Sequence, residues 1–274
     1  MLDQAYKLRE YYNSPKAGEQ TAQEIISVTS GKGGTGKSVT AFYLAQMLAN
    51  KGYKTLLVEF DFNLGSLEYH LNISPRATIY DLFSGTALFE EALTEISPNF
   101  HVIFGDNGKL NFPENRISHI QNFFVALKNK ATDYDFVIID NGAGISNEIF
   151  ETIKNSTLNL IVTLQDPVAV MDAYVLIKLM AKNSIKCKKG IIINKCSSAT
   201  EGEVAFQNLH KATKHFFKEE IHLIGLIPEN DFCKSINMLD EHLISRSKTH
   251  PVITEITSAA LKISTIAQLA NNHQ

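Results

Sequence analysis

Cysteine is scarce in this sequence, and tryptophan is absent. The three cysteines, Cys187, Cys196 and Cys233, form no CxxC pair among 274 residues. So few cysteines, in an odd number, argue against a disulfide framework and for a reducing compartment. The spacing also lacks the common zinc and iron–sulfur ligand patterns. Histidines offer no substitute, because His210 and His215 lie five residues apart, which is the wrong spacing for a shared helical metal face.

Long apolar runs and an excess of basic charge are also missing. The 26 Lys and Arg residues stand against 29 Asp and Glu residues, for a net charge of -3. Non-specific coating of nucleic acid needs a strongly basic surface, so we expect no such role. The longest apolar runs, such as 158–164, fall far short of the roughly 20 residues of a membrane-spanning helix. The N-terminus lacks the apolar core of a secretory signal. We expect a cytoplasmic protein, with peripheral contact at the inner face of the cell membrane left open.

Short apolar strands alternate with helical patterns from residue 25 onward. The expected strands are 25–30, 54–60, 100–104, 135–140, 158–164, 190–195 and 221–227. The expected helices are 38–52, 117–130, 168–182, 203–217 and 252–270. Near-continuous apolar strands indicate burial on both faces, which is typical of parallel sheets. The sequence therefore predicts an α/β domain over 25–274, a doubly wound, mostly parallel sheet with helices on both faces.

The N-terminal segment does not show the alternation of strands and helices that is predicted for the rest of the chain. Residues 2–12 carry one apolar stripe at helical spacing, and 13–24 are polar, with Pro15 and Gly18 interrupting regular structure. We expect a short helix over 1–12 and a linker over 13–24. A helix this short is marginal alone in water, so it should dock on its own domain or fold against a partner.

The stretch SGKGGTGKS, Ser30–Ser38, fits the phosphate-binding pattern G-x-x-x-x-G-K-[ST] directly after a strand and at the start of a helix. Glycines let successive backbone N–H groups point at phosphate oxygens. Lys37 can neutralise the β- and γ-phosphates, and Ser38 can ligate Mg²⁺. We call residues 30–38 the P-loop. The predicted nucleotide-binding residues here are Gly31, Lys32, Gly33, Gly34, Thr35, Gly36, Lys37, Ser38 and Val39.

A second lysine, Lys32, follows the first glycine of this loop. The run KGGTGKS resembles the deviant Walker A motif of the MinD/ParA ATPase superfamily, which implies a MinD-like P-loop NTPase fold. The resemblance implies that Lys32 contacts nucleotide phosphates, often across a homodimer that sandwiches two ATP molecules. It would stabilise the charge that develops during γ-phosphoryl transfer, as an arginine finger does elsewhere.

Two acidic strand ends complete this resemblance. Asp61, just past a strand, resembles the switch I aspartate that positions the attacking water. Asp140 ends an apolar strand as a Walker B carboxylate does, and Gly142 and Gly144 supply a pliable switch II. The implied catalytic residues are Lys32, Lys37 and Asp61, and the implied Mg²⁺ site is Ser38, Asp61 and Asp140. Glu59 and Asn63 depart from the pattern, because family members often carry Asp and commonly Gly at those positions.

The base-binding region predicts ATP as the nucleotide. Asn194-Lys195 is followed by Ser197 where a guanine-binding N-K-x-D loop needs Asp. Without that carboxylate the guanine N1–H and amino group lack their acceptor, which disfavours GTP. The family resemblance implies that Asn194 bonds adenine and that Pro228 and Glu229 pack on the base. We therefore expect ATP and Mg²⁺ as cofactors.

The segment DQAYKLR near the N-terminus resembles the DQAxxLR motif of the FlhG group (FleN or YlxH) of flagellar-number regulators. Residues 140–146 and 171–178 look like the same group. The resemblance implies an ATPase switch that controls flagellar number and placement, and an N-terminal helix that stimulates the GTPase FlhF. Flagellar switch or regulatory proteins are further implied partners. The residues carried over to the FlhF contact are Asp3, Gln4, Ala5, Leu8 and Arg9.

Two other functions share the predicted site. A ParA-type DNA-segregation ATPase needs basic clusters on its surface, whereas groups such as Lys186, Lys188 and Lys189 are local here. A nucleotide-gated scaffold with little turnover is the second, with Glu59 as its supporting hint. An iron-protein reductase is excluded, since it needs cysteines before Cys187.

The last helical pattern bears on membrane contact. Residues 252–270 contain one Lys, one Glu and no aromatic residue. Such a helix is better suited to pack on the sheet than to insert among anionic headgroups, so we expect weak or absent membrane contact. Its apolar stripe consists of Ile256, Ala260, Ile263, Ala267 and Ala270.

Overall fold

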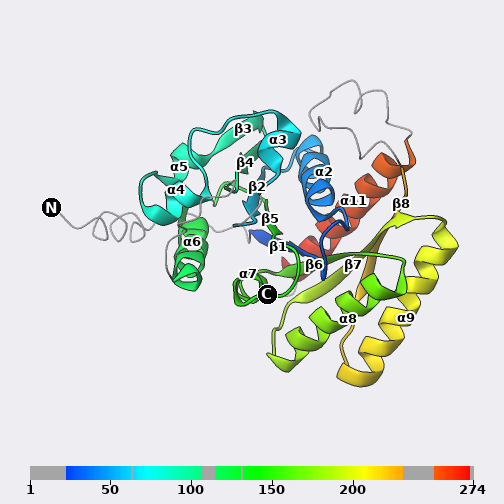
Figure 1. Cartoon of the computed structure of the whole chain (residues 1–274). Coiled ribbons are helices and arrows are strands. Elements are labelled where there is room, and N and C mark those ends of the chain that lie inside the picture. The colour runs from blue at the N-terminus through cyan, green and yellow to red at the C-terminus, as the bar shows by residue number, and fades with distance from the viewer. Residues whose placement is uncertain (1–22, 63–64, 107–114, 131, 231–249, 272–274) are drawn as a thin grey trace.

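The computed structural model describes residues 23–62, 65–106, 115–130, 132–230 and 250–271 (Figure 1). Within these ranges eight strands form one sheet, in the order β3-β4-β2-β5-β1-β6-β7-β8. Neighbouring strands are parallel except for the antiparallel pair β3–β4. The strands are β1 Glu24–Thr29, β2 Thr55–Phe60, β3 Thr94–Ser97, β4 Phe100–Ile103, β5 Phe136–Asn141, β6 Leu158–Leu164, β7 Lys188–Cys196 and β8 His222–Pro228. The predicted α/β fold with a mostly parallel sheet is confirmed.

Helices cover both faces of this sheet (Figure 1). One face packs against α2, α3 and α11, and the other packs against α4, α5 and α6 at one end and α7, α8 and α9 at the other. The helices are α2 Lys37–Asn50, α3 Leu67–Leu71, α4 Ile79–Ser84, α5 Phe89–Ala92, α6 Arg116–Lys130, α7 Asn147–Lys154, α8 Pro167–Lys182, α9 Ala199–Phe217 and α11 Pro251–Asn271.

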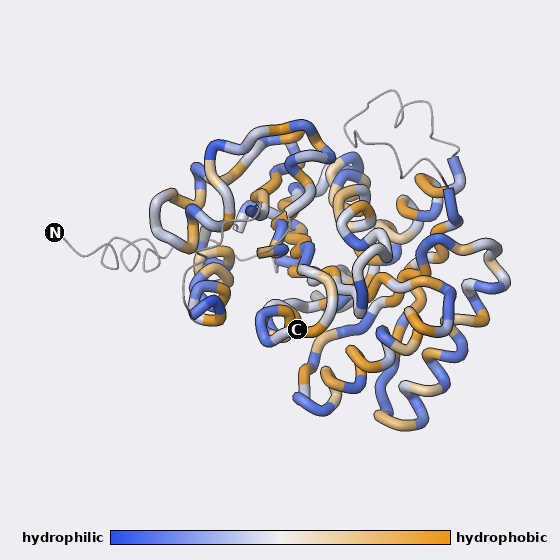
Figure 2. Tube along the Cα trace, in the orientation of Figure 1, coloured by the Kyte–Doolittle hydropathy of each residue, from blue (hydrophilic) through white to orange (hydrophobic). Residues whose placement is uncertain are grey.

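Successive strand residues face opposite layers, because side chains alternate along an extended chain. In β2, Leu57 packs with the α2 layer while Leu56 and Val58 pack with the α4–α6 layer. All six residues of β2 are buried, as are all six of β5. Figure 2 shows hydrophobic residues through these central strands and hydrophilic ones toward the loops. Burial on both faces explains why the strands read as continuous apolar runs rather than alternating ones.

Strand β1 lies at the centre, between β5 and β6. The chain winds outward through β2 on one side of β1 and through β7 and β8 on the other, so the strand order reverses at β1. In parallel sheets, ligands bind outside the carboxyl ends of the strands at such a reversal. The P-loop, which joins β1 to α2, lies at this point.

Several details differ from the sequence-based expectation. The antiparallel edge strand β3 and the short helices α3, α4, α5 and α7 were not predicted, because four to eight residues carry too little periodicity. Strand β1 begins at Glu24, one residue before the expected start of the first strand. The expected helix over 1–12 and residues 13–22 of the linker lie outside the described residues.

The C-terminal helix α11 packs on the α2 layer of the sheet. Ile256, Ala260 and Ile263 of its stripe are buried in that layer, as expected. The side chains of Ala267 and Ala270 lie outside the description. No helix in the described part of the chain has the length and apolar character to cross a membrane.

Candidate functional site

The P-loop curls between β1 and α2 because its glycines allow a conformation that other residues rarely adopt. Gly34 and Gly36 have positive φ angles of 78° and 83°, in the left-handed region. Gly36 is also the N-cap of α2. The loop lies against α8, because a Cβ atom on Gly31 would collide with Asp172 of that helix. The P-loop therefore leads directly into the N-terminus of α2, and a helix N-terminus favours an anion.

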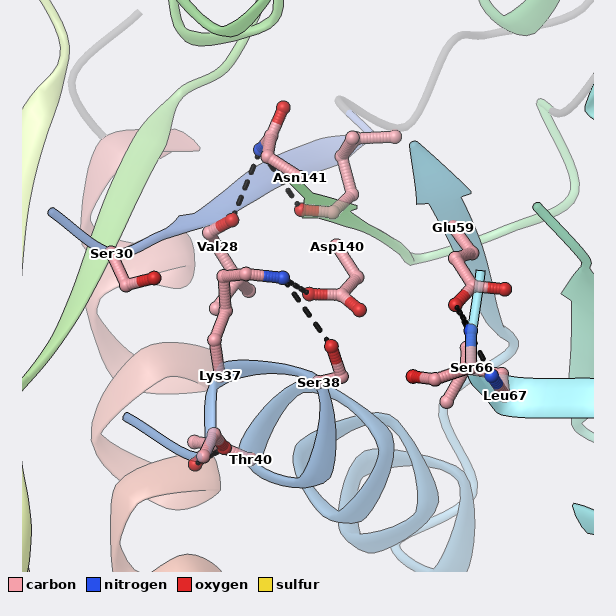
Figure 3. Close-up of polar contacts among 12 residues, drawn as sticks. Val28, Ser30, Lys37, Ser38, Thr40, Glu59, Ser66, Leu67, Asp140 and Asn141 are labelled. Atoms are coloured by element: carbon pink, nitrogen blue, oxygen red, sulfur yellow. Dashed lines mark hydrogen bonds and ion pairs between the residues drawn. The ribbon is translucent and has the colours of Figure 1, made fainter. Parts of the chain in front are cut away.

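Lys37 and Asp140 form a buried ion pair beneath the loop (Figure 3). The Lys37 Nζ lies 2.5 Å from Asp140 Oδ1 and donates to Ser38 Oγ at 3.3 Å. The side chains of Lys37 and Asp140 are 8% and 0% exposed. The three residues predicted for phosphate and metal binding at this corner therefore meet in one hydrogen-bonded group.

The second oxygen of Asp140 bears on the expected Mg²⁺. Asp140 Oδ2 is buried and has no hydrogen-bond partner among the described residues. A buried carboxylate oxygen without a partner is costly unless a cation or water satisfies it. Mg²⁺ prefers carboxylate, hydroxyl, phosphate and water oxygens, and the Ser38 hydroxyl lies at the same corner. The residues present fit a magnesium–nucleotide complex.

Asp61 lies immediately after β2, beside the loop that follows β5. A Cβ atom on Gly142 would be 3.7–3.8 Å from the Asp61 carboxylate group, in ordinary van der Waals contact. Asp61 also lines a cavity of about 220 Å³ together with Asn141, Gly142 and Ser146. The structure therefore brings the predicted switch I aspartate next to the predicted switch II glycine.

The loop after β5 is fastened to the P-loop and to β1. The Gly144 N–H donates to the Ser30 carbonyl at 2.9 Å, with Gly144 at a φ of 91°. The Asn141 amide donates to the Val28 carbonyl at 3.0 Å (Figure 3) and accepts from Thr152 Oγ1 at 2.5 Å. The loop after β5 is thus connected directly to the first residue of the P-loop.

Lys32 projects toward the N-terminus of α8. Its Nζ lies 3.5 Å from Asp166 Oδ1, and the two side chains are 35% and 42% exposed. Asp166 caps α8 by accepting from the Ala169 N–H at 3.0 Å. The hydrogen bond from Ala169 lowers the pKa of Asp166 most, and the positive charge of Lys32 lowers it further. About a third of the Lys32 side chain is exposed, whereas that of Lys37 is buried.

The carboxyl end of β7 is fastened to the P-loop by two hydrogen bonds. Asn194 Nδ2 donates to the Thr35 carbonyl at 2.7 Å, and Lys195 Nζ donates to the Gly34 carbonyl at 2.9 Å. Lys195 was not predicted as a site residue. The Asn194-Lys195 dipeptide was the feature of the sequence that could have pointed to Lys195. The left-handed φ of 53° at Lys195 could not be inferred from the sequence.

The predicted base loop lies next to this strand end. Pro228 pairs with Cys196 in the sheet, and the Glu229 N–H donates to the Cys196 carbonyl at 2.9 Å. Asn194, Pro228 and Glu229 therefore gather at one edge of the site. Their contacts with adenine stay a prediction.

Glu59 is a component of the site that the sequence marked only as a departure from a pattern. It is 1% exposed and pairs in register with Asp140 on the adjacent strand. Burial, and then the nearby Asp140 charge, raises the pKa of Glu59 to about 7, against the opposing effect of three backbone N–H donors.

The central reversal of strand order, the glycine loop at β1 and the Lys37–Asp140 pair define a P-loop nucleotide-binding protein. Residues 26–238 match the model of the CobQ/CobB/MinD/ParA nucleotide binding domain. The chain belongs to this family of MinD/ParA-type ATPases.

Curated relatives place the chain near the flagellar branch of that family. It is 31% identical over 212 residues to the flagellum site-determining protein YlxH of Helicobacter pylori, covering 77% of this chain and 71% of that protein. It is 25% identical over 208 residues to the antiactivator FleN of Pseudomonas aeruginosa, covering 76% and 74%. These relatives agree with the predicted FlhG-group resemblance.

Solved structures give the same fold. The cell division ATPase MinD of Pyrococcus furiosus superposes with a TM-score of 0.74 at 22% identity, covering 89% of this chain and all of that one. MinD of Pyrococcus horikoshii, complexed with Mg-ADP, superposes with a TM-score of 0.72 at 22% identity, covering 90% and 98%.

Proposed function

We propose that this protein is an ATP-driven switch that binds ATP with Mg²⁺, forms a homodimer and hydrolyses the nucleotide. The observation that carries the proposal is the corner formed by Lys37, Asp140 and Ser38, where a cation and metal-ligating oxygens meet under the P-loop. A glycine turn without nucleotide binding would have no reason to bury a lysine and an aspartate together, since burial of charge is costly.

Each predicted residue has a role that its position supports. The P-loop amides and Lys37 hold the β- and γ-phosphates, and Ser38 and Asp140 hold the metal ion directly or through water. Bound Mg²⁺ would neutralise charge on the phosphates. Asp61 orients the attacking water, and Lys32 stabilises the charge that develops on the γ-phosphoryl group of the partner protomer.

The adenine preference rests on Asn194 and on the serine at position 197. The Thr35 contact uses the Asn194 amide nitrogen, so its carbonyl oxygen remains to accept from the adenine amino group. Guanine would need a carboxylate at position 197. Pro228 and Glu229 would pack beside the base.

In the cell, the proposed switch regulates flagellar number and placement. This part of the proposal rests on the YlxH and FleN likeness and on the DQAYKLR segment. Residues 1–12 would act as a separate partner-activating helix on a linker, stimulating FlhF from the cytoplasm. The contact residues proposed for FlhF are Asp3, Gln4, Ala5, Leu8 and Arg9.

Size-exclusion chromatography and phosphate release with ATP and Mg²⁺ test the switch. Wild type should release phosphate at a rate that climbs faster than linearly with protein concentration. Asp61→Ala should elute as a stable dimer with ATP, because hydrolysis is blocked. Asp133→Ala, on an exposed loop before β5, is the matched control and should behave as wild type. A monomeric Asp61→Ala protein at saturating ATP would refute the dimer.

A deletion tests the partner contact separately. Removal of residues 1–12 should abolish stimulation of FlhF GTP hydrolysis while calorimetry with ATP and Mg²⁺ still gives wild-type affinity. Stimulation that survives the deletion would remove FlhF activation from this segment and leave the ATPase proposal standing.

A further inference from the structure

The Glu59 side chain accepts hydrogen bonds from two segments that lie outside β2. Its side chain is buried near the end of β2, where three backbone N–H groups donate to the carboxylate. Ser66 and Leu67 donate to Oε1 (Figure 3), at 2.6 and 3.1 Å, and Gly105 donates to Oε2 at 3.0 Å. One carboxylate thus binds two separate segments, the start of α3 and the loop that leaves β4.

Asp61 lies inside the stretch of chain that Glu59 closes. The chain leaves β2 at Phe60, passes Asp61 and returns to the Glu59 side chain at Ser66. The return is braced further by the Gly65 N–H, which donates to the Asp106 carbonyl at 3.1 Å. Asp61 therefore lies between Phe60, the last residue of β2, and Ser66, which is hydrogen-bonded to Glu59 of the same strand.

The residues on either side of Asp61 are anchored in the opposite layer. Phe60 and Phe62 are 3% and 8% exposed, and their ring centroids lie 5.4 Å apart. Both rings contact Phe83 of α4, at centroid distances of 6.0 and 5.7 Å. Aromatic packing fixes one side of the segment, and the Glu59 hydrogen bonds fix the other.

Space for this side chain depends on two glycines. A Cβ atom on Gly105 would lie 2.9 Å from Glu59 Cγ, and one on Gly65 would lie 3.2 Å from Glu59 Oε2. An aspartate at position 59 would be shorter by one methylene, about 1.5 Å from bond geometry, and would not reach both segments. The length of the side chain is matched to its three donors.

We propose that Glu59 is a positioning residue for ATP hydrolysis, which fixes the Asp61 carboxylate beside Gly142 by tying the start of α3 and the loop after β4 to β2. The inference rests on the proposed function, because it acts through the predicted role of Asp61. Glu59 itself is placed to touch no nucleotide, since its carboxylate is turned toward backbone amides.

Steady-state kinetics of Glu59→Gln test the inference. A glutamine offers one acceptor oxygen and an NH₂ group that cannot accept from an N–H, so it cannot hold both segments. We expect kcat to fall about 10- to 100-fold, as a small misplacement of a reacting group does, with KM for ATP within about twofold. Glu59→Asp, which keeps the charge but is too short to reach both segments, should lower kcat to a similar extent. Glu24→Gln, another buried glutamate but at the amino end of β1, is the matched control and should keep the wild-type kcat.

A double variant separates positioning from general loosening of the fold. On the Asp61→Ala background, Glu59→Gln should cause no further fall in residual turnover, because the two residues act in one path. A further fall by the same factor as in wild type would overturn the inference.

Hydrogen exchange keeps the test independent of the proposed function. Peptides covering 65–67 and 105–106 should exchange faster in Glu59→Gln than in wild type, while peptides covering 140–144 should not change. Unchanged exchange at 65–67 would overturn the inference. Wild-type protein that hydrolyses no ATP would instead refute the proposed function, and the exchange result would still show whether Glu59 holds the loop.

Discussion

Glu59 and Asp140 stand directly opposite each other on the neighbouring parallel strands β2 and β5. Both are buried acids, yet Asp140 has the Lys37 ammonium at 2.5 Å whereas the Glu59 contacts are backbone amides. Two adjacent buried carboxylates disfavour each other's charged forms. Burial, and then the nearby Asp140, accordingly raises the pKa of Glu59.

The raised pKa of Glu59 predicts a pH dependence of stability. In the unfolded chain this group titrates near 4.5, and in the folded protein near 7. The folded state therefore binds the proton more tightly, and this binding adds to the free energy of unfolding. The added stability is fully present below pH 4.5 and is lost as pH rises through 7. One pKa unit corresponds to about 1.4 kcal/mol, so the loss of folding free energy is at most about 3–4 kcal/mol.

Urea unfolding of the nucleotide-free protein between pH 5 and 8 measures this effect. Wild type should lose stability across the range relative to Glu59→Gln, whose side chain does not titrate. Parallel profiles for the two proteins would contradict the assignment to Glu59.

Removal of Lys37 should destabilise the nucleotide-free protein as well as prevent nucleotide binding. Lys37→Met leaves the fully buried Asp140 charge without its partner. Breaking a buried pair from one side costs about 3–5 kcal/mol. The double variant Lys37→Met with Asp140→Asn should recover part of that loss in chemical unfolding. Equal losses in the single and double variants would show that the pair is not the cause.

Glycine is required at position 36 but not at position 33. Gly36 has a φ of 83°, and a Cβ atom there would collide with the Asn194 amide, whereas Gly33 has no atom within 4 Å of that position. Gly36→Ala should lower the free energy of unfolding by about 1–3 kcal/mol. Gly33→Ala should change it by less than about 0.5 kcal/mol. Thermal unfolding of the two variants checks the difference, and equal Tm values would contradict it.

The two described cysteines should be unreactive in the folded protein. Both thiols are buried, and burial raises the pKa of Cys187 and raises that of Cys196 to about 11. Alkylation requires the thiolate, so iodoacetamide at pH 8 should leave both unmodified, while unfolding in urea should expose them. Peptide mass spectrometry measures the label at each site. Rapid modification of Cys196 in native buffer would show that the strand end of β7 opens.

The sequence was most informative where one physical requirement acts on a short stretch. Phosphate binding needs glycines at fixed spacing and a lysine at a helix start, so the glycine turn at Gly36 and the helix start at Lys37 could be predicted without coordinates. Strands such as β5 were found because burial on both faces leaves a plain apolar run. Helix α3 and strand β3 were missed because so few residues cannot show a period.

Contacts between distant segments could not be predicted from the sequence. Glu59 binds the amide of Gly105, 46 residues away, and Lys195 binds the carbonyl of Gly34, 161 residues away. In both contacts one partner is a backbone atom, which every residue possesses, so no side-chain pattern marks it. Fold-level packing alone brings these groups together.

The hydrogen bonds from Asn194 and Lys195 join the carboxyl end of β7, where we propose that the base binds, to the P-loop, where we propose that the phosphates bind. Under the proposed function, base preference therefore cannot be changed independently of phosphate binding. A substitution at Asn194 that is meant to change base selectivity would also remove the hydrogen bond to Thr35. We therefore expect such a variant to bind the triphosphate more weakly as well.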